Sequence, residues 1–171
     1  MNKHEVEEET RKHIDNVRSL LDKVSRSLKD RALKHDRSKL QSPERETFEV
    51  YTEKLKGTTY GSDEYKQYLK EMKPALDHHY AENRHHPEHY QLTLADDFAY
   101  HEQGKKNLIC CMTLIDITEM LCDWLAATKR HADGDIMKSI ELNQKRFGYS
   151  DELKQIFINT VSYELQYLKG S

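Results

Sequence analysis

The stretch LICCMTLIDITEMLCDWL, from Leu108 to Leu125, is the most apolar part of the sequence. Its apolar residues recur at helical spacing and no Gly or Pro interrupts it, which predicts a buried helix within about residues 104–129. Three carboxylates, those of Asp116, Glu119 and Asp123, share the predicted face of Ile109 and Met120. A carboxylate in a buried helix is costly unless a cation compensates its charge. The stretch therefore predicts either buried ion pairs, with Arg or Lys as partners, or a bound metal ion.

The rest of the sequence is also helical in pattern, with only six Gly, three Pro and little strand-like alternation. Further helices are expected at about residues 6–28, 30–40, 43–55, 62–87, 135–146 and 150–168. Pro74 should kink or restart the helix that contains it, and Pro87 should end it. We expect an all-α protein, a single helical bundle of six to eight helices. It should form one domain over residues 1–171, with a metal-site core at about 10–125 and C-terminal helices at about 135–168.

Composition restricts the partners of the chain. The net charge is −3 and the charged residues are interleaved, so duplex nucleic acid is not an expected partner. No apolar run approaches the roughly 20 residues that span a bilayer, and the acidic N-terminus is unlike a signal peptide. The three cysteines form no CxxC motif, and we expect buried free thiols in a cytoplasmic protein. An oligomer is compatible with this composition.

Histidines are concentrated in DHHYAENRHHPEH, residues 77–89, where five of them fall within the twelve positions 78–89. Imidazole and carboxylate groups are the ligands of Zn, Fe, Mn and other first-row metals. His79 is in phase with the apolar Met72 and Leu76, and His86 follows seven residues later. We expect His79 and His86 to be metal ligands. The alternatives at this point are His78, His85 and His89.

Two further groups of polar residues fit such a site. His13 lies on the apolar stripe of the first expected helix, as a metal ligand or as a hydrogen-bonded core residue. His35 and Asp36 are adjacent, and Lys39 follows within one turn as a phosphate-binding cation or a solvated lysine. The remaining candidates are Lys39, Arg84 and Glu119 as catalytic residues, Lys39, Arg84, Tyr80 and Tyr90 for substrate binding, and Glu82 and Asp123 for orienting the ligand imidazoles.

The order H…HD…D along this chain resembles the HD superfamily of metal-dependent phosphohydrolases and related di-iron oxygenases. The resemblance implies that His13, the pair His35–Asp36 and Asp116 bind one or two divalent metal ions, with His79 and His86 as the additional histidines. Lys39 matches the lysine of the HDxxK variant, which is implied to hold a phosphate or phosphonate. Two departures stand out: His79 and His86 are closer together than usual, and Lys39 replaces a Glu of many nucleotidase members. The chain is also similar to an uncharacterised group of small phage and bacterial proteins that carry HDxSK.

The resemblance implies a metal-dependent phosphohydrolase acting on a small phosphorylated substrate, with a nucleotide as the first candidate. The metal would activate water, and Lys39 and Arg84 would balance phosphate charge. One alternative is a mixed-valence di-iron oxygenase of the HD type. Another is a non-catalytic binding protein that contains a metal.

Overall fold

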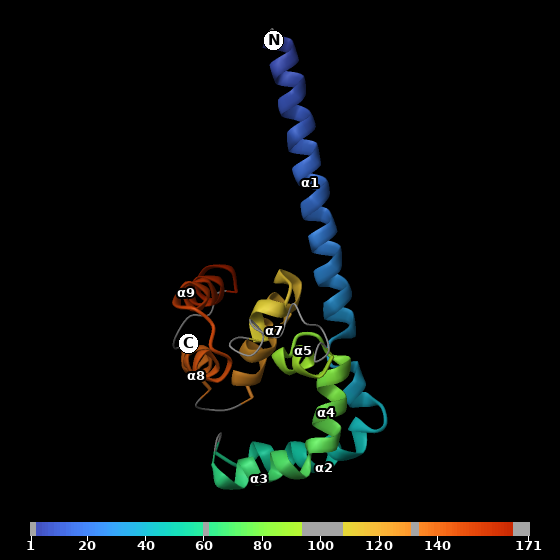
Figure 1. The fold of residues 1–171 in the computed structure, drawn as a ribbon, viewed down its shortest axis with the longest axis vertical. Helices are drawn as coiled ribbons and strands as arrows, with labels where there is room; N and C mark the ends of the chain where they lie inside the picture. Colours follow the sequence, from blue (N-terminus) through green and yellow to red (C-terminus); the bar gives the residue numbers. More distant parts are fainter. Residues whose placement is uncertain (1–2, 60–61, 94–107, 131–133, 166–171) are drawn as a thin grey trace. The chain divides into compact units, whose positions relative to one another are not determined.

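The computed structural model describes residues 3–59, 62–93, 108–130 and 134–165 of the chain (Figure 1). These residues form eight α-helices and three short helical turns, and they contain no strand. The prediction of an all-α protein with six to eight helices is confirmed for this part of the chain. Among the described helices, none combines the length and the apolar character that a membrane crossing requires.

Contacts divide the chain into two compact units, Met1–His35 and Asp36–Ser171. The first unit is essentially one helix, whose contacts join successive turns of the same segment. The expected single domain over residues 1–171 stays a prediction.

Helix α1 (Lys3–Lys34) forms the first unit without a break. The expected boundary near residue 29 is wrong, because no Gly or Pro occurs there and Lys34 pairs with Asp30 one turn earlier, at 3.0 Å. The expected second helix over residues 30–40 is replaced by the end of α1 and the 3-10 helix η1 (Arg37–Leu40). Asp36 precedes η1 with a φ of 55°, in the left-handed region that Asp tolerates better than most residues.

The second unit begins with η1 and four α-helices, which are α2 (Glu44–Lys56), α3 (Asp63–Glu71), α4 (Lys73–Glu82) and α5 (Pro87–Thr93). Helix α4 contacts η1, α2, α3 and α5, so it lies at the centre of this group. Pro74 restarts the chain as α4, as expected. The helix ends at Glu82 rather than at Pro87, and Pro87 instead opens α5, because a residue without an N–H suits a first turn. The turn at residues 83–86 therefore carries Asn83, Arg84, His85 and His86.

The rest of the second unit comprises η2 (Leu108–Cys111), α7 (Leu114–Thr128), α8 (Ile136–Phe147), α9 (Asp151–Asn159) and a π-helical turn, η3 (Thr160–Glu164). Their buried apolar side chains form one core. Trp124 of α7 stacks on Phe147 of α8 at a centroid distance of 6.4 Å and meets Phe157 of α9 edge to face at 5.8 Å. These aromatic contacts fix the order in which α7, α8 and α9 pack.

Contrary to expectation, the three cysteines are not buried. Cys110 and Cys122 are exposed, Cys111 is half-buried and all three are free thiols. On α7 the buried apolar positions are Met120, Leu121 and Leu125, and Cys122 lies off that face.

Helix α7 begins later than the expected residue 104, at Leu114, because a capping box starts it there. Thr113 Oγ1 accepts from the Asp116 N–H, while Asp116 Oδ2 accepts from the Thr113 N–H at 2.9 Å. The same oxygen accepts from the Tyr90 hydroxyl at 2.7 Å and from Arg84 at 3.3 Å. Asp116 is fully buried and pairs with Arg84, whose side chain is 50% exposed, so an Arg partner foreseen for this helix is present at the edge of the buried region.

We expect Ile140→Ala to lower the free energy of unfolding by about 2–5 kcal/mol, because Ile140 is fully buried and a cavity would remain. The matched control is Leu142→Ala on the same helix, where Leu142 is 49% exposed and the loss should be about 0.5 kcal/mol or less. Urea denaturation followed by Trp124 fluorescence measures both. Equal losses would contradict this orientation of α8.

Asp116→Ala should destabilise the protein by about 2–4 kcal/mol, because it removes a helix cap and leaves the buried Tyr90 hydroxyl without its acceptor. Thr113→Ala removes the cap but keeps the pair with Arg84, so it should cost only about 1 kcal/mol. Thermal and urea unfolding of the two variants give the comparison. A loss for Asp116→Ala no larger than that for Thr113→Ala would be the contrary result.

Candidate metal centre

Four side chains of the second unit converge on one point: those of Asp36, His79, His85 and His86. Each offers one ligand atom, and these four atoms all lie within 4.8 Å of one another. Asp36 precedes η1, His79 lies in the last turn of α4, and His85 and His86 lie in the turn before α5. The site is therefore assembled where α4 ends, beside η1.

The separations suit a first-row metal ion. His79 Nε2 lies 2.9 Å from His86 Nε2 and 3.3 Å from Asp36 Oδ1, and His85 Nε2 lies 3.5 Å from the same oxygen. Metal–nitrogen bonds of about 2.0–2.1 Å in a tetrahedral site place neighbouring ligand atoms about 3.3 Å apart. The three separations of 2.9, 3.3 and 3.5 Å are close to this value, and all the ligand atoms lie within 4.8 Å of one another.

Burial favours the ligand form of the histidines. His79 and His85 are each only 1% exposed. Burial, together with the nearby His85 and His79, holds the pKa of His86 well below its usual value. A neutral imidazole is the form that binds a metal, so the enclosure keeps His86 ready for that role.

Two further carboxylates contact the Nδ1 atoms of His79 and His85, on the side of each ring away from the candidate metal position. Glu44 Oε2 lies 2.8 Å from His79 Nδ1, and Glu119 Oε1 lies 3.2 Å from His85 Nδ1. A carboxylate at Nδ1 fixes that nitrogen as the donor and leaves Nε2 as the acceptor facing the centre. Glu119 thus lies where an orienting residue is needed.

Sequence reasoning missed Glu44, which is fully buried in the first turn of α2. Its carboxylate also contacts His78 Nδ1 at 2.8 Å and accepts from the Ser38 hydroxyl at 3.0 Å. In the sequence, a Glu just after Ser42-Pro43 is a common feature of a helix start, where it favours the helix dipole. Glu44 differs from an ordinary glutamate at a helix start only in being buried against His79.

Lys39 pairs with Asp36, its Nζ lying 2.5 Å from Oδ2. Burial by itself would raise the pKa of Asp36, but the neighbouring His79 and the Lys39 ammonium outweigh it and hold that pKa well below its usual value. Asp36 is therefore ionised and suited to a cation. The expected contact of Lys39 with a phosphate stays a prediction.

The remaining predicted residues are distributed over both units. His13 is exposed on α1, and His35 ends the first unit with its N–H bonded to the Arg31 carbonyl at 2.8 Å. Their ligand roles stay predictions. In the part of the chain that the structure describes, Asp116 is not grouped with Asp36; it is bonded to Thr113, Tyr90 and Arg84. The ligand role of Asp116 also stays a prediction.

Several of the other candidates lie close to the imidazoles. The Tyr80 ring is 5.0 Å from the His86 ring, and Asp123 offers an oxygen within 4.8 Å of one on Asp36. Arg84 and Tyr90 contact Asp116 rather than the four-residue group, and Glu82 is exposed. Their expected roles toward a substrate or a ligand imidazole stay predictions.

Sequence reasoning left His78, His85 and His89 as alternatives, and the structure distinguishes them. His85 joins His79 and His86 in the group. His78 is 41% exposed and bonds to Glu44, while His89 Nδ1 lies 2.9 Å from the Tyr80 carbonyl oxygen. The three histidines that meet are therefore His79, His85 and His86.

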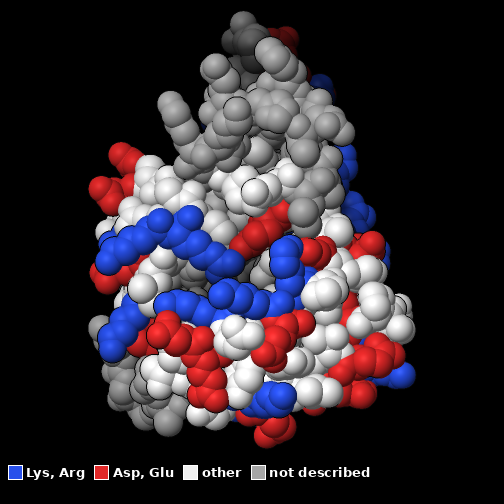
Figure 2. Space-filling view, turned by 60° about the horizontal axis from the view of Figure 1, so that its bottom comes forward, with Lys and Arg blue, Asp and Glu red and all other residues white. Residues whose placement is uncertain are grey.

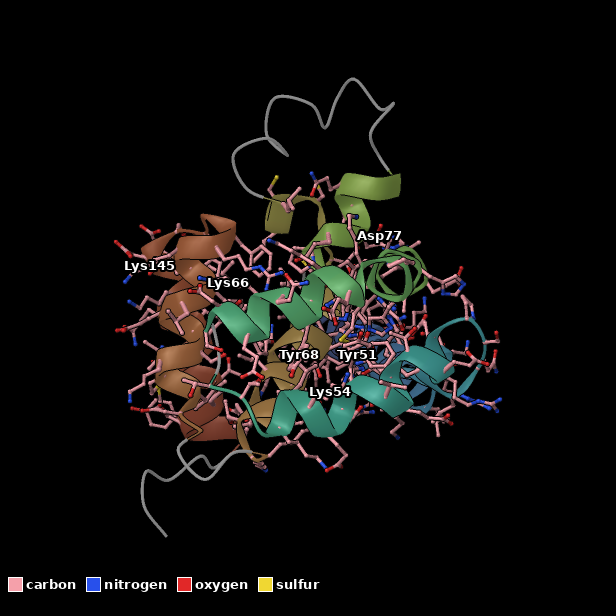
Figure 3. The ribbon with its side chains drawn as sticks, turned by 90° about the horizontal axis from the view of Figure 1, so that it is seen from below. Tyr51, Lys54, Lys66, Tyr68, Asp77 and Lys145 are labelled. Atoms are coloured by element: carbon pink, nitrogen blue, oxygen red, sulfur yellow. The ribbon has the colours of Figure 1, made fainter. Side chains whose placement is uncertain are left out.

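A separate polar surface lies on α2 and α3, and Figure 3 labels its Tyr51, Lys54, Lys66 and Tyr68. The Lys54 ammonium lies 4.6 Å from the Tyr51 ring centroid and 5.5 Å from that of Tyr68, and Lys66 pairs with Asp63 at 3.3 Å. Figure 2 shows Lys and Arg side chains near the middle of the face it draws, with Asp and Glu beside them. The charges of Lys54 and Lys66 are thus engaged with neighbouring rings and a carboxylate.

Comparison with known proteins identifies a family. No curated protein and no solved structure matches the chain. A family model matches residues 2–166, which include all four residues of the candidate metal centre. The chain therefore belongs to the family of unknown function DUF5662.

Proposed function

We propose that this protein binds a divalent metal ion through Asp36, His79, His85 and His86 and hydrolyses a small phosphorylated substrate, with a nucleotide as the first candidate. The observation that carries the proposal is the meeting of three imidazole nitrogens and one carboxylate oxygen within 4.8 Å. The HD resemblance adds His35 and Asp116 as further ligands, and their assignment belongs to the same proposal. His13 lies about 30 Å from the C-terminal end of the unbroken helix α1, so it is left out of this ligand set.

The donor set defines the chemistry. Three imidazoles and one carboxylate suit Zn, Fe, Mn or Co better than Ca, which prefers oxygen ligands. A bound ion of this kind would activate water and polarise a phosphoryl oxygen. Glu44 and Glu119 hold the imidazoles of His79 and His85 in the ligand tautomer. Lys39 carries a positive charge beside Asp36, where it would also balance a bound phosphate.

A second candidate is a protein whose metal ion has no catalytic role. It is supported by the number of protein ligands, because four of them already complete a tetrahedral shell. A catalytic ion keeps a position for water or substrate, whereas a structural ion does not. The visible spectrum of Co²⁺-substituted protein separates the two, since added inorganic phosphate shifts it only when an exchangeable position exists.

The metal site is tested by the metal content of protein purified without added metal. We expect about one equivalent or more in the wild type and a loss of at least tenfold in affinity for His79→Ala and His85→Ala. The matched controls are His78→Ala and His89→Ala, which remove neighbouring histidines outside the group and should retain the metal. Loss from all four variants, or from none, would contradict the assignment.

The reaction is tested by release of inorganic phosphate from a panel of nucleotides with Mn²⁺ or Co²⁺, with and without O₂. We expect turnover that needs no O₂, that a chelator abolishes, and that Lys39→Ala lowers by about 10²-fold or more because a phosphate-facing charge is lost. The control is Lys73→Ala, since Lys73 pairs with Asp77 on the exposed side of α4.

Other results of this assay are equally informative. Bound iron together with substrate-dependent O₂ consumption would replace the hydrolase with the di-iron oxygenase. A metal-loaded protein that converts no phosphorylated substrate and leaves its Co²⁺ spectrum unchanged on phosphate addition would favour the non-catalytic role.

A further inference from the structure

Helix α1 carries an apolar stripe that is exposed along its middle. Ile14, Val17, Leu21 and Val24 are 50%, 41%, 63% and 48% exposed, and α1 contains no buried residue. Large contiguous apolar surfaces are uncommon on monomeric proteins, because burying them is favourable. The stripe is therefore suited to a partner.

The spacing of the stripe is that of a coiled-coil seam. Steps of three, four and three residues separate Ile14, Val17, Leu21 and Val24, which is the a/d alternation of a heptad. Thr10 and Leu28 extend the same seam by one position at each end. Leu20, 60% exposed, flanks this seam, and the heptad spacing of the seam residues favours a second helix as the partner.

The opposite side of α1 is polar and already internally paired. Lys12 lies 3.0 Å from both Glu8 and Glu9, at heptad positions that point away from the seam. These exposed ion pairs make that side of the helix polar. The seam remains the surface that gains from burial.

Charge is distributed unevenly along α1, and this determines the direction of the partner. Residues 5–9 contain four Glu and no Lys or Arg. Residues 23–34 contain five Lys or Arg and one Asp. Two parallel copies would place like charges side by side at both ends, whereas two antiparallel copies place each acidic end beside a basic end.

We propose that α1 pairs with α1 of a second copy of this chain as an antiparallel two-helix coiled coil. In such a coil each a residue faces a d residue, so Val17 packs against the partner's Leu21 and Ile14 against the partner's Val24. The same register places Thr10 opposite the partner's Leu28 and Glu7 opposite the partner's Arg31. These pairs are symmetric about residue 19 and bury the whole seam. The proposal does not depend on the metal site.

The mass of the full chain in solution tests the pairing. Light scattering at tens of micromolar should give about twice the chain mass of 20.3 kDa, and Leu21→Asp should give the single chain mass. The matched control is Leu33→Asp, because Leu33 is 76% exposed and lies at an outward heptad position, so this variant should remain dimeric. Circular dichroism and Trp124 fluorescence establish that both variants are folded.

A monomeric wild type would overturn the proposal and mean that the stripe is covered within one chain or stays exposed. Equal dissociation by Leu21→Asp and Leu33→Asp would also overturn it, since the seam would then have no special role.

Disulfide formation tests the direction of the helices. In a background with Cys110, Cys111 and Cys122 replaced by Ser, Val17→Cys mixed with Leu21→Cys should cross-link on mild oxidation, because these positions face each other. Val17→Cys alone should not cross-link, because its own copy lies several residues away along the seam. Efficient cross-linking of Val17→Cys alone would indicate a parallel pair and overturn the antiparallel arrangement.

Discussion

The carboxylate of Glu44 is fully buried, and its negative charge needs hydrogen-bond donors around it. The arrangement of most of the candidate metal centre follows from this need. A buried carboxylate without partners is unstable, so the chain must surround it with donors. Glu44 contacts His78, His79 and Ser38, which joins the start of α2 to α4 and to η1. The same contacts fix the His79 ring, and with it the position at which Asp36, His85 and His86 meet.

A second buried carboxylate has the corresponding role at the other edge of this region. Asp116 caps α7 and accepts from Tyr90 of α5 and Arg84 of the preceding turn. One turn later on α7, Glu119 lies against His85. The turn at residues 83–86 is thus held at two points by α7, by Asp116 through Arg84 and by Glu119 through His85. Its two histidines are positioned before any ligand arrives, which lowers the cost of ordering a site.

These contacts relate the proposed chemistry to the fold. The imidazoles lie in the last turn of a helix and in the short turn after it, so their spacing depends on backbone geometry that α2 and α7 stabilise. Burial keeps His86 neutral, while Lys39 keeps Asp36 ionised. A neutral imidazole beside an ionised carboxylate is suited to bind a cation. Helix α1, by contrast, forms the first unit by itself and contains no buried residue, and ion pairs between successive turns stabilise it locally.

By itself the sequence determined the all-α class, the extents of α2 and α8 and the segment in which the candidate metal centre lies, because helical periodicity and proline positions are local properties. It also limited the candidate ligands to a few histidines, Asp36 and Asp116. The tertiary structure decided which of them meet: His85 joined His79 and His86 because the helix ends at Glu82, so a single helical phase does not extend through residues 83–86. Burial of Glu44 and the pairing of Asp116 with Arg84 were likewise decided at this level. Both depend on which distant helices pack together, and no local pattern of residues carries that information.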